Sequence, residues 1–99
     1  MGLFGFGKNE KTVKMSDFFS AEDLATITEK AEAARSRGSM ADLLGKGLID
    51  YISNPEKDIS CSRFNKFIKV ADSFVKNFDP SLETIIRQGI EKFRSATGK

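Results

Sequence analysis

The pattern that decides the fold is LETIIRQGIEKF, residues 82–93. Its apolar positions are spaced i, i+3, i+4, i+7, i+8 and i+11, and they are Leu82, Ile85, Ile86, Gly89, Ile90 and Phe93. Because an α-helix turns by about 100° per residue, these positions form one stripe along its surface. Asp79 and Pro80 before the segment, and Gly98 after it, are typical of helix starts and stops. We therefore expect a helix over residues 80–96 that buries one side.

A first helix is predicted over residues 20–37. Ser20 is a suitable N-cap, and Gly38 is a suitable residue to end the helix. The apolar positions form a narrow seam of Leu24, Ile27, Ala31 and Ala34. Because two of these residues are alanines, the helix can pack close to a neighbour.

A second helix is predicted over residues 40–53, with Ser39 as its cap and Asn54-Pro55 as its end. Its expected buried face consists of Met40, Leu43, Leu44, Gly47, Leu48 and Tyr51. Gly47 lies on this face, where a missing side chain lets a neighbouring helix approach. Gly45 lies off the face and has no packing reason in the pattern.

A third helix is predicted over residues 60–78. Its apolar positions cover about 120° of the circumference, and they are Phe64, Phe67, Ile68, Ala71, Phe74, Val75 and Phe78. Two starts are open, since Asn54 can cap a helix that has Pro55 at its first position, or Ser60 can cap one after a turn. We favour Ser60.

These segments predict an all-α protein, a compact four-helix bundle. Residues 16–99 form a single helical domain, and residues 1–15 are expected to be a flexible tail rich in Gly, Phe and Lys. Only Asp79-Pro80 separates the last two apolar stripes. We therefore expect the last two helices to form an antiparallel hairpin across which the first two pack.

The composition argues against several classes of function. Histidine is absent, which removes the commonest acid–base catalyst and the commonest transition-metal ligand. No P-loop, dinucleotide or calcium-loop motif occurs, so we expect no enzyme, no cofactor and no metal. The net charge of +2 is small for a general nucleic-acid binder. One cysteine, no secretory signal and no apolar run of membrane-spanning length suggest a cytoplasmic protein.

The N-terminal tail carries three large apolar side chains, Leu3, Phe4 and Phe6, between glycines and ahead of several lysines. One hypothesis is a docking peptide that fills a pocket on a protein partner. A second is a membrane anchor that inserts into the headgroup boundary of an anionic lipid surface. A third is that these side chains fold back and fill a gap in the protein's own bundle.

The third helix carries two further candidate surfaces. Its basic face, Arg63, Lys66, Lys69 and Lys76, is either a contact for nucleic-acid phosphates or a solvated surface. Its phenylalanine stripe, Phe64, Phe67, Phe74 and Phe78, is typical of core packing, and the alternative is an apolar interface with a partner or a second copy. Cys61 lies near a helix start, where a thiol is either reactive or a small packed residue.

Together these features indicate a non-catalytic protein–protein interaction or adaptor module. It would bind a partner, or itself as a homo-oligomer, through the tail or through an incompletely covered helix face. A small nucleic-acid-binding protein and a peripheral membrane protein are the alternatives.

Overall fold

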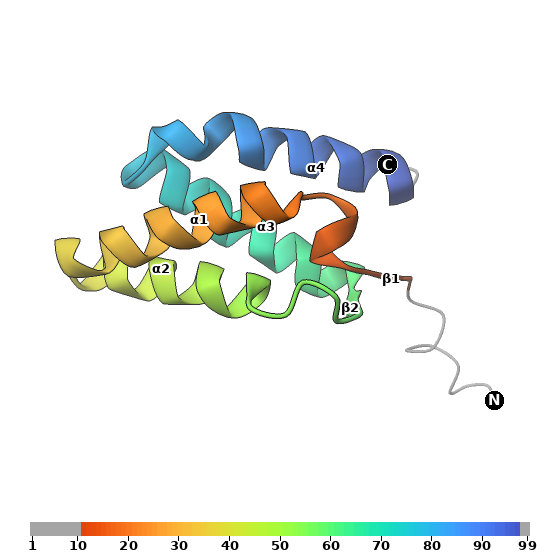
Figure 1. The fold of residues 1–99 in the computed structure, drawn as a ribbon, viewed down its shortest axis with the longest axis horizontal. Coiled ribbons are helices and arrows are strands. Elements are labelled where there is room, and N and C mark those ends of the chain that lie inside the picture. Colours follow the sequence, from red (N-terminus) through yellow and green to blue (C-terminus); the bar gives the residue numbers. More distant parts are fainter. Residues whose placement is uncertain (1–10, 98–99) are drawn as a thin grey trace.

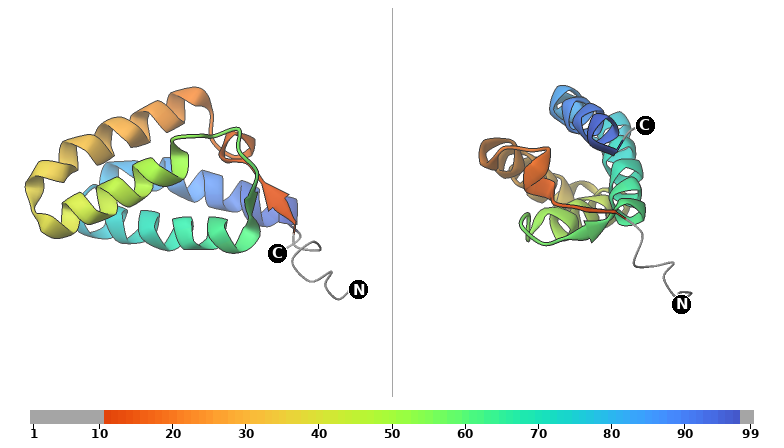
Figure 2. Two further views of the ribbon diagram at one scale, coloured as in Figure 1. Left: turned by 90° about the horizontal axis from the view of Figure 1, so that it is seen from below. Right: turned by 90° about the vertical axis from the view of Figure 1, so that its right-hand side faces the viewer.

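The computed structural model describes residues 11–97 of the chain. It contains four long helices: α1 Ala21–Ala34, α2 Ser39–Ile52, α3 Cys61–Asn77 and α4 Glu83–Thr97. Viewed from one end, the four helices follow one another in order around a common core (Figures 1 and 2). The all-α four-helix bundle predicted from the sequence is therefore confirmed.

Local capping explains where three of the helices begin. The Ser20 hydroxyl accepts a hydrogen bond from the Asp23 backbone N–H at 3.0 Å, and the Ser60 hydroxyl accepts one from Arg63 N–H at 3.1 Å. The start of α3 after Ser60, which we favoured over Asn54-Pro55, is thus confirmed. Asp79 accepts from Ser81 N–H at 3.2 Å, and the 3-10 turn η4, Pro80–Leu82, leads into α4.

The connection between α1 and α2 depends on a glycine. The 3-10 turn η3, Arg35–Arg37, continues α1 and ends at Gly38, whose φ is 137°. L side chains rarely adopt this conformation, so glycine is needed there. Gly38 is also the N-cap of α2, and no side chain caps this helix. The expectation that Ser39 caps α2 is therefore wrong, because Ser39 is already the first helical residue.

Residues 11–15 are part of the folded domain and not of a flexible tail, so the boundary predicted after residue 15 is wrong for them. The strand β1, Thr12–Val13, pairs antiparallel with β2, Ile59–Ser60, and the 3-10 turn η2, Met15–Asp17, follows. Val13 and Met15 are buried, with 6% and 1% of their surfaces exposed. The sequence shows no strand signal here because a two-residue strand is too short to alternate.

An aromatic cluster at the centre of the bundle joins the segment before α1 to α3 and α4. The Phe64 and Phe93 rings stack with their centroids 4.2 Å apart. The Phe18 ring packs edge-on against both, at 5.2 and 5.6 Å. Phe19 packs edge-on against Phe67 at 5.9 Å. Aromatic pairs in these geometries add roughly 0.5–1.5 kcal/mol each beyond the area that they bury.

Phe19 also explains the glycine in the apolar stripe of α4. A Cβ atom at Gly89 would lie 2.2 Å from Cζ of Phe19, so the ring occupies the space that a side chain would need. The rest of the stripe is confirmed, since Leu82, Ile86 and Phe93 are buried and Ile85 and Ile90 pack against the core.

The buried face of α2 differs from the predicted one. Its buried residues are Ala41, Gly45, Leu48 and Ile52. Met40 and Leu43, which we placed on the buried face, are 58% and 64% exposed. The first half of the helix thus turns Ala41 and Gly45 inward in place of Met40 and Leu43, while Leu48 is buried as predicted.

The two glycines of α2 accordingly exchange their expected roles. A Cβ at Gly45 would lie 2.7 Å from the carbonyl oxygen of Ala31, so the backbones of α1 and α2 approach each other closely at this position. A Cβ at Gly47 would meet only Cγ1 of Val70, at an ordinary 3.6 Å. The close approach that we expected at Gly47 therefore occurs at Gly45.

This difference predicts opposite effects for two matched substitutions. Gly45→Ala should destabilise the protein by about 1–3 kcal/mol, because the added methyl group overpacks against backbone atoms of α1. Gly47→Ala should be neutral or stabilising by up to about 1 kcal/mol, because alanine favours the helix. Urea denaturation of both variants measures this, and equal effects would contradict the assignment.

Ion pairs between charged side chains also link the end of α1 to α2. Arg35 Nε donates to the Asp42 carboxylate at 2.9 Å, and Glu32 and Lys46 extend the network at 3.3 and 3.5 Å. The hydrogen bond from Arg35 lowers the pKa of the Asp42 carboxyl below its usual range. The same bond raises the pKa of the Arg35 guanidinium.

We predict that Asp42→Asn lowers the melting temperature at pH 7. A carboxyl with a lowered pKa in the folded state stabilises it above the ordinary pKa of about 3.9, and this contribution is lost as the pH falls through the folded value. The difference between wild type and variant should therefore shrink below about pH 4. Thermal melts at pH 7 and pH 3 test this, and a constant difference would contradict it.

Candidate functional site

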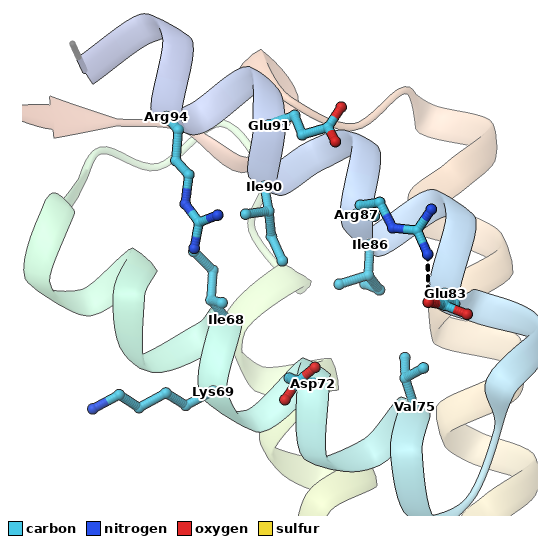
Figure 3. Close-up of a pocket in the computed structure, with 10 residues that line it drawn as sticks. All are labelled: Ile68, Lys69, Asp72, Val75, Glu83, Ile86, Arg87, Ile90, Glu91 and Arg94. Atoms are coloured by element: carbon cyan, nitrogen blue, oxygen red, sulfur yellow. Dashed lines mark hydrogen bonds and ion pairs between the residues drawn. The ribbon is translucent and has the colours of Figure 1, made fainter. Parts of the chain in front are cut away.

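A surface groove runs between α3 and α4 (Figure 3). Its volume is about 550 Å³. The floor is apolar and is formed by Ile68 and Val75 of α3 and Ile86 and Ile90 of α4. Val75 and Ile86 are nearly buried, whereas Ile68 and Ile90 are half-buried and face the groove.

Charged side chains form the rim of this groove, and its two ends differ. At the end near the α3–α4 connection, Arg87 pairs with Glu83 on the same helix. Asp72, on the α3 side, pairs with Lys76 at 3.2 Å. These charges are therefore matched within their own helices.

The other end of the groove carries charges without such partners. Lys69, Glu91 and Arg94 line it, and none of them has an ion pair within residues 11–97. The Arg94 side chain extends from α4 toward Ile68 of α3 (Figure 3). This end therefore presents two cations and one carboxylate beside the partly exposed side chains of Ile68 and Ile90.

A smaller pocket of about 290 Å³ lies beyond this end, at the end of the bundle where β1 lies (Figure 1). It is lined by Lys11, Cys61, Asn65, Phe93, Arg94 and Thr97. Arg94 lines both hollows, so the pocket and the groove are neighbours along α4. Cys61 is half-buried at the start of α3, and the hypothesis of a reactive thiol stays a prediction.

The predicted basic face of α3 is exposed, but two of its four cations, Arg63 and Lys76, form ion pairs with neighbouring carboxylates. Arg63 lies 4.7 Å above the Tyr51 ring and 3.7 Å from the Asp50 carboxylate. Lys76 pairs with Asp72, as described above. Only Lys66 and Lys69 have no ion pair among the described residues. The face is therefore partly neutralised by neighbouring acids.

The phenylalanine stripe is core. Phe64, Phe67 and Phe74 are fully buried, and half-buried Phe78 packs near Phe74 at 6.1 Å. The packing interpretation is confirmed for the three buried rings, and the alternative of an exposed interface is wrong for them. Phe18 and Phe93 pack on Phe64, and Phe19 packs on Phe67.

The remaining candidates are distributed as follows. Leu3, Phe4 and Phe6 lie outside the described residues, so the docking and anchor hypotheses for them stay predictions.

The α3–α4 groove was not predicted from the sequence, although Ile68 and Ile90 were both within predicted apolar stripes. Each lies at the edge of its stripe, and this position was the available signal.

Two searches of residues 11–97 gave negative results. No group of three His, Cys, Asp or Glu residues in this range is arranged to hold a metal ion. No helix within it is long and apolar enough to cross a membrane.

Comparison of the chain with protein-family models, curated proteins and solved structures finds no match. The groove is therefore interpreted from its own chemistry.

Proposed function

We propose that the protein is a non-catalytic interaction module whose α3–α4 groove binds an amphipathic helix of a protein partner. The observation that supports this most is the combination of an apolar floor, in which Ile68 and Ile90 stay partly exposed, with a charged rim. Two antiparallel helices with an apolar channel between them are a common receptor for a third helix, whose apolar face fills the channel. We expect such a module to act in the cytoplasm.

The dimensions of the floor suit a short helical anchor. Ile86 and Ile90 are separated by one helical turn, about 6 Å along the axis of α4. Two or three apolar side chains spaced i, i+3 or i+4, and i+7 on a partner helix would match this floor.

The charged rim would determine the direction in which the partner helix lies in the groove. At the Arg94 end, Lys69 and Arg94 favour a partner carboxylate, while Glu91 offers a site for a partner cation. At the opposite end, the Glu83–Arg87 pair already satisfies its own charges. The partner helix is therefore expected to lie with its acidic end near Arg94.

Substitution in the groove should remove partner binding without unfolding the domain. We expect Ile90→Glu to reduce partner capture at least tenfold, because a carboxylate would be placed on the apolar floor. Gln88→Glu adds the same charge to an exposed position of the same helix and should leave capture unchanged. Quantitative affinity capture of source lysate on wild type and both variants measures the effect.

Two further measurements keep this experiment specific to the groove. Circular dichroism melts verify that the Ile90→Glu variant is folded. A photo-cross-linking amino acid at Asp72 should form adducts with the captured partner, whereas one at exposed Lys46 of α2 should not. A folded Ile90→Glu variant that retains its partners, or equal adducts from both positions, would refute the proposal.

A further inference from the structure

Lys11, the first described residue, is held at the end of the bundle where the Arg94 end of the groove lies. The Lys11 carbonyl accepts a hydrogen bond from Cys61 N–H at 3.2 Å. The Lys11 ammonium donates to the Ala96 carbonyl at 3.0 Å. Residue 11 is therefore fixed between the start of α3 and the end of α4.

A continuous surface leads from this point into the groove. Lys11 lines the smaller pocket together with Phe93 and Arg94, and Arg94 is also part of the groove lining. Ile90 lies one turn from Arg94, about 6 Å along the axis, and Ile86 lies one turn further. A segment that leaves Lys11 along α4 thus meets first the pocket and then the isoleucine floor.

The residues that precede Lys11 have the required length. An extended chain covers about 3.3 Å per residue, so Phe6 can reach roughly 17 Å from Lys11 and Leu3 about 26 Å. Both distances exceed the length of α4 between Arg94 and Ile86, which is about 12 Å.

Their side chains also match the groove. Leu3, Phe4 and Phe6 are large and apolar, and Gly2–Gly7 carries no charged side chain. Gly5 between Phe4 and Phe6, with Gly2 and Gly7 on either side, lets the backbone lie close to the surface of α3 and α4. Arg94 can additionally pack its guanidinium on a phenylalanine ring as the segment passes.

We infer that, in the absence of a partner, Leu3, Phe4 and Phe6 of the same chain occupy the α3–α4 groove. The inference rests on the proposed function, because it assigns the first occupant of the same groove. A tether of this length holds the segment at an effective concentration on the order of 1 mM. Even weak intrinsic binding then suffices for occupancy, and a partner helix binds by displacing the segment.

The test compares the full chain with a full-length variant in which Leu3, Phe4 and Phe6 are all serine. In NMR spectra, the methyl signals of Ile68, Ile86 and Ile90 should shift between the two proteins. Ile27 of α1 and Ile52 of α2 are buried in the core. Their signals are the internal control and should not shift.

A peptide of residues 1–8, MGLFGFGK, then supplies the segment in trans. Added to the triple-serine variant, it should move the groove signals toward their wild-type positions with half-saturation well below about 1 mM, because a segment tethered at that effective concentration fills the groove only if its intrinsic Kd is smaller. Added to wild type at the same concentration it should have a much smaller effect, because the groove is already occupied.

Three results would overturn the inference: unchanged groove signals in the variant, shifts of equal size at Ile27 and Ile52, or groove shifts in wild type that disappear on dilution. The last would assign the groove to the segment of a second copy. None of these results alters partner cross-linking at Asp72, so failure of the inference is distinguishable from failure of the proposed function.

Discussion

The stack of Phe64 on Phe93 is the contact on which the arrangement of α3, α4 and the segment before α1 depends. Phe18 closes the stack from its edge and thereby attaches the N-terminal part of the domain to both helices. On α3, Ile68 lies one turn from Phe64 and about 40° from it around the helix axis. On α4, Ile90 lies nearly one turn from Phe93 and about 60° from it around the axis. The same rings that close the core therefore leave these isoleucines at the flank, where the groove forms.

Close backbone approach is the second constraint, and it acts through two glycines at different helix interfaces. Gly45 allows α2 to approach the Ala31 carbonyl of α1, and Gly89 makes room for the Phe19 ring against α4. In both cases a missing side chain determines which face of a helix turns inward. This explains why Met40 and Leu43, although larger than Ala41 and Gly45, lie outside.

Features that depend on neighbouring residues could be predicted from the sequence. The seam of α1, the stripe of α4 and the start of α3 at Ser60 follow from spacing and capping, which act within a few residues. The pairing of Thr12 with Ser60 could not be predicted, because it joins segments that are distant in the chain. The groove was missed for a related reason: Ile68 and Ile90 belong to apolar stripes, and only the packing of α3 on α4 decides which stripe edges stay uncovered.

The chain has one tyrosine and no tryptophan, so Tyr51 is the only side chain that absorbs and emits at wavelengths beyond the phenylalanine bands. Its ring packs on Phe67 at 5.7 Å and lies under the Arg63 guanidinium, and it does not line the α3–α4 groove. Tyrosine emission is therefore an intrinsic optical probe of the α2–α3 contact. It distinguishes loss of the bundle from occupation of the α3–α4 groove without any added label.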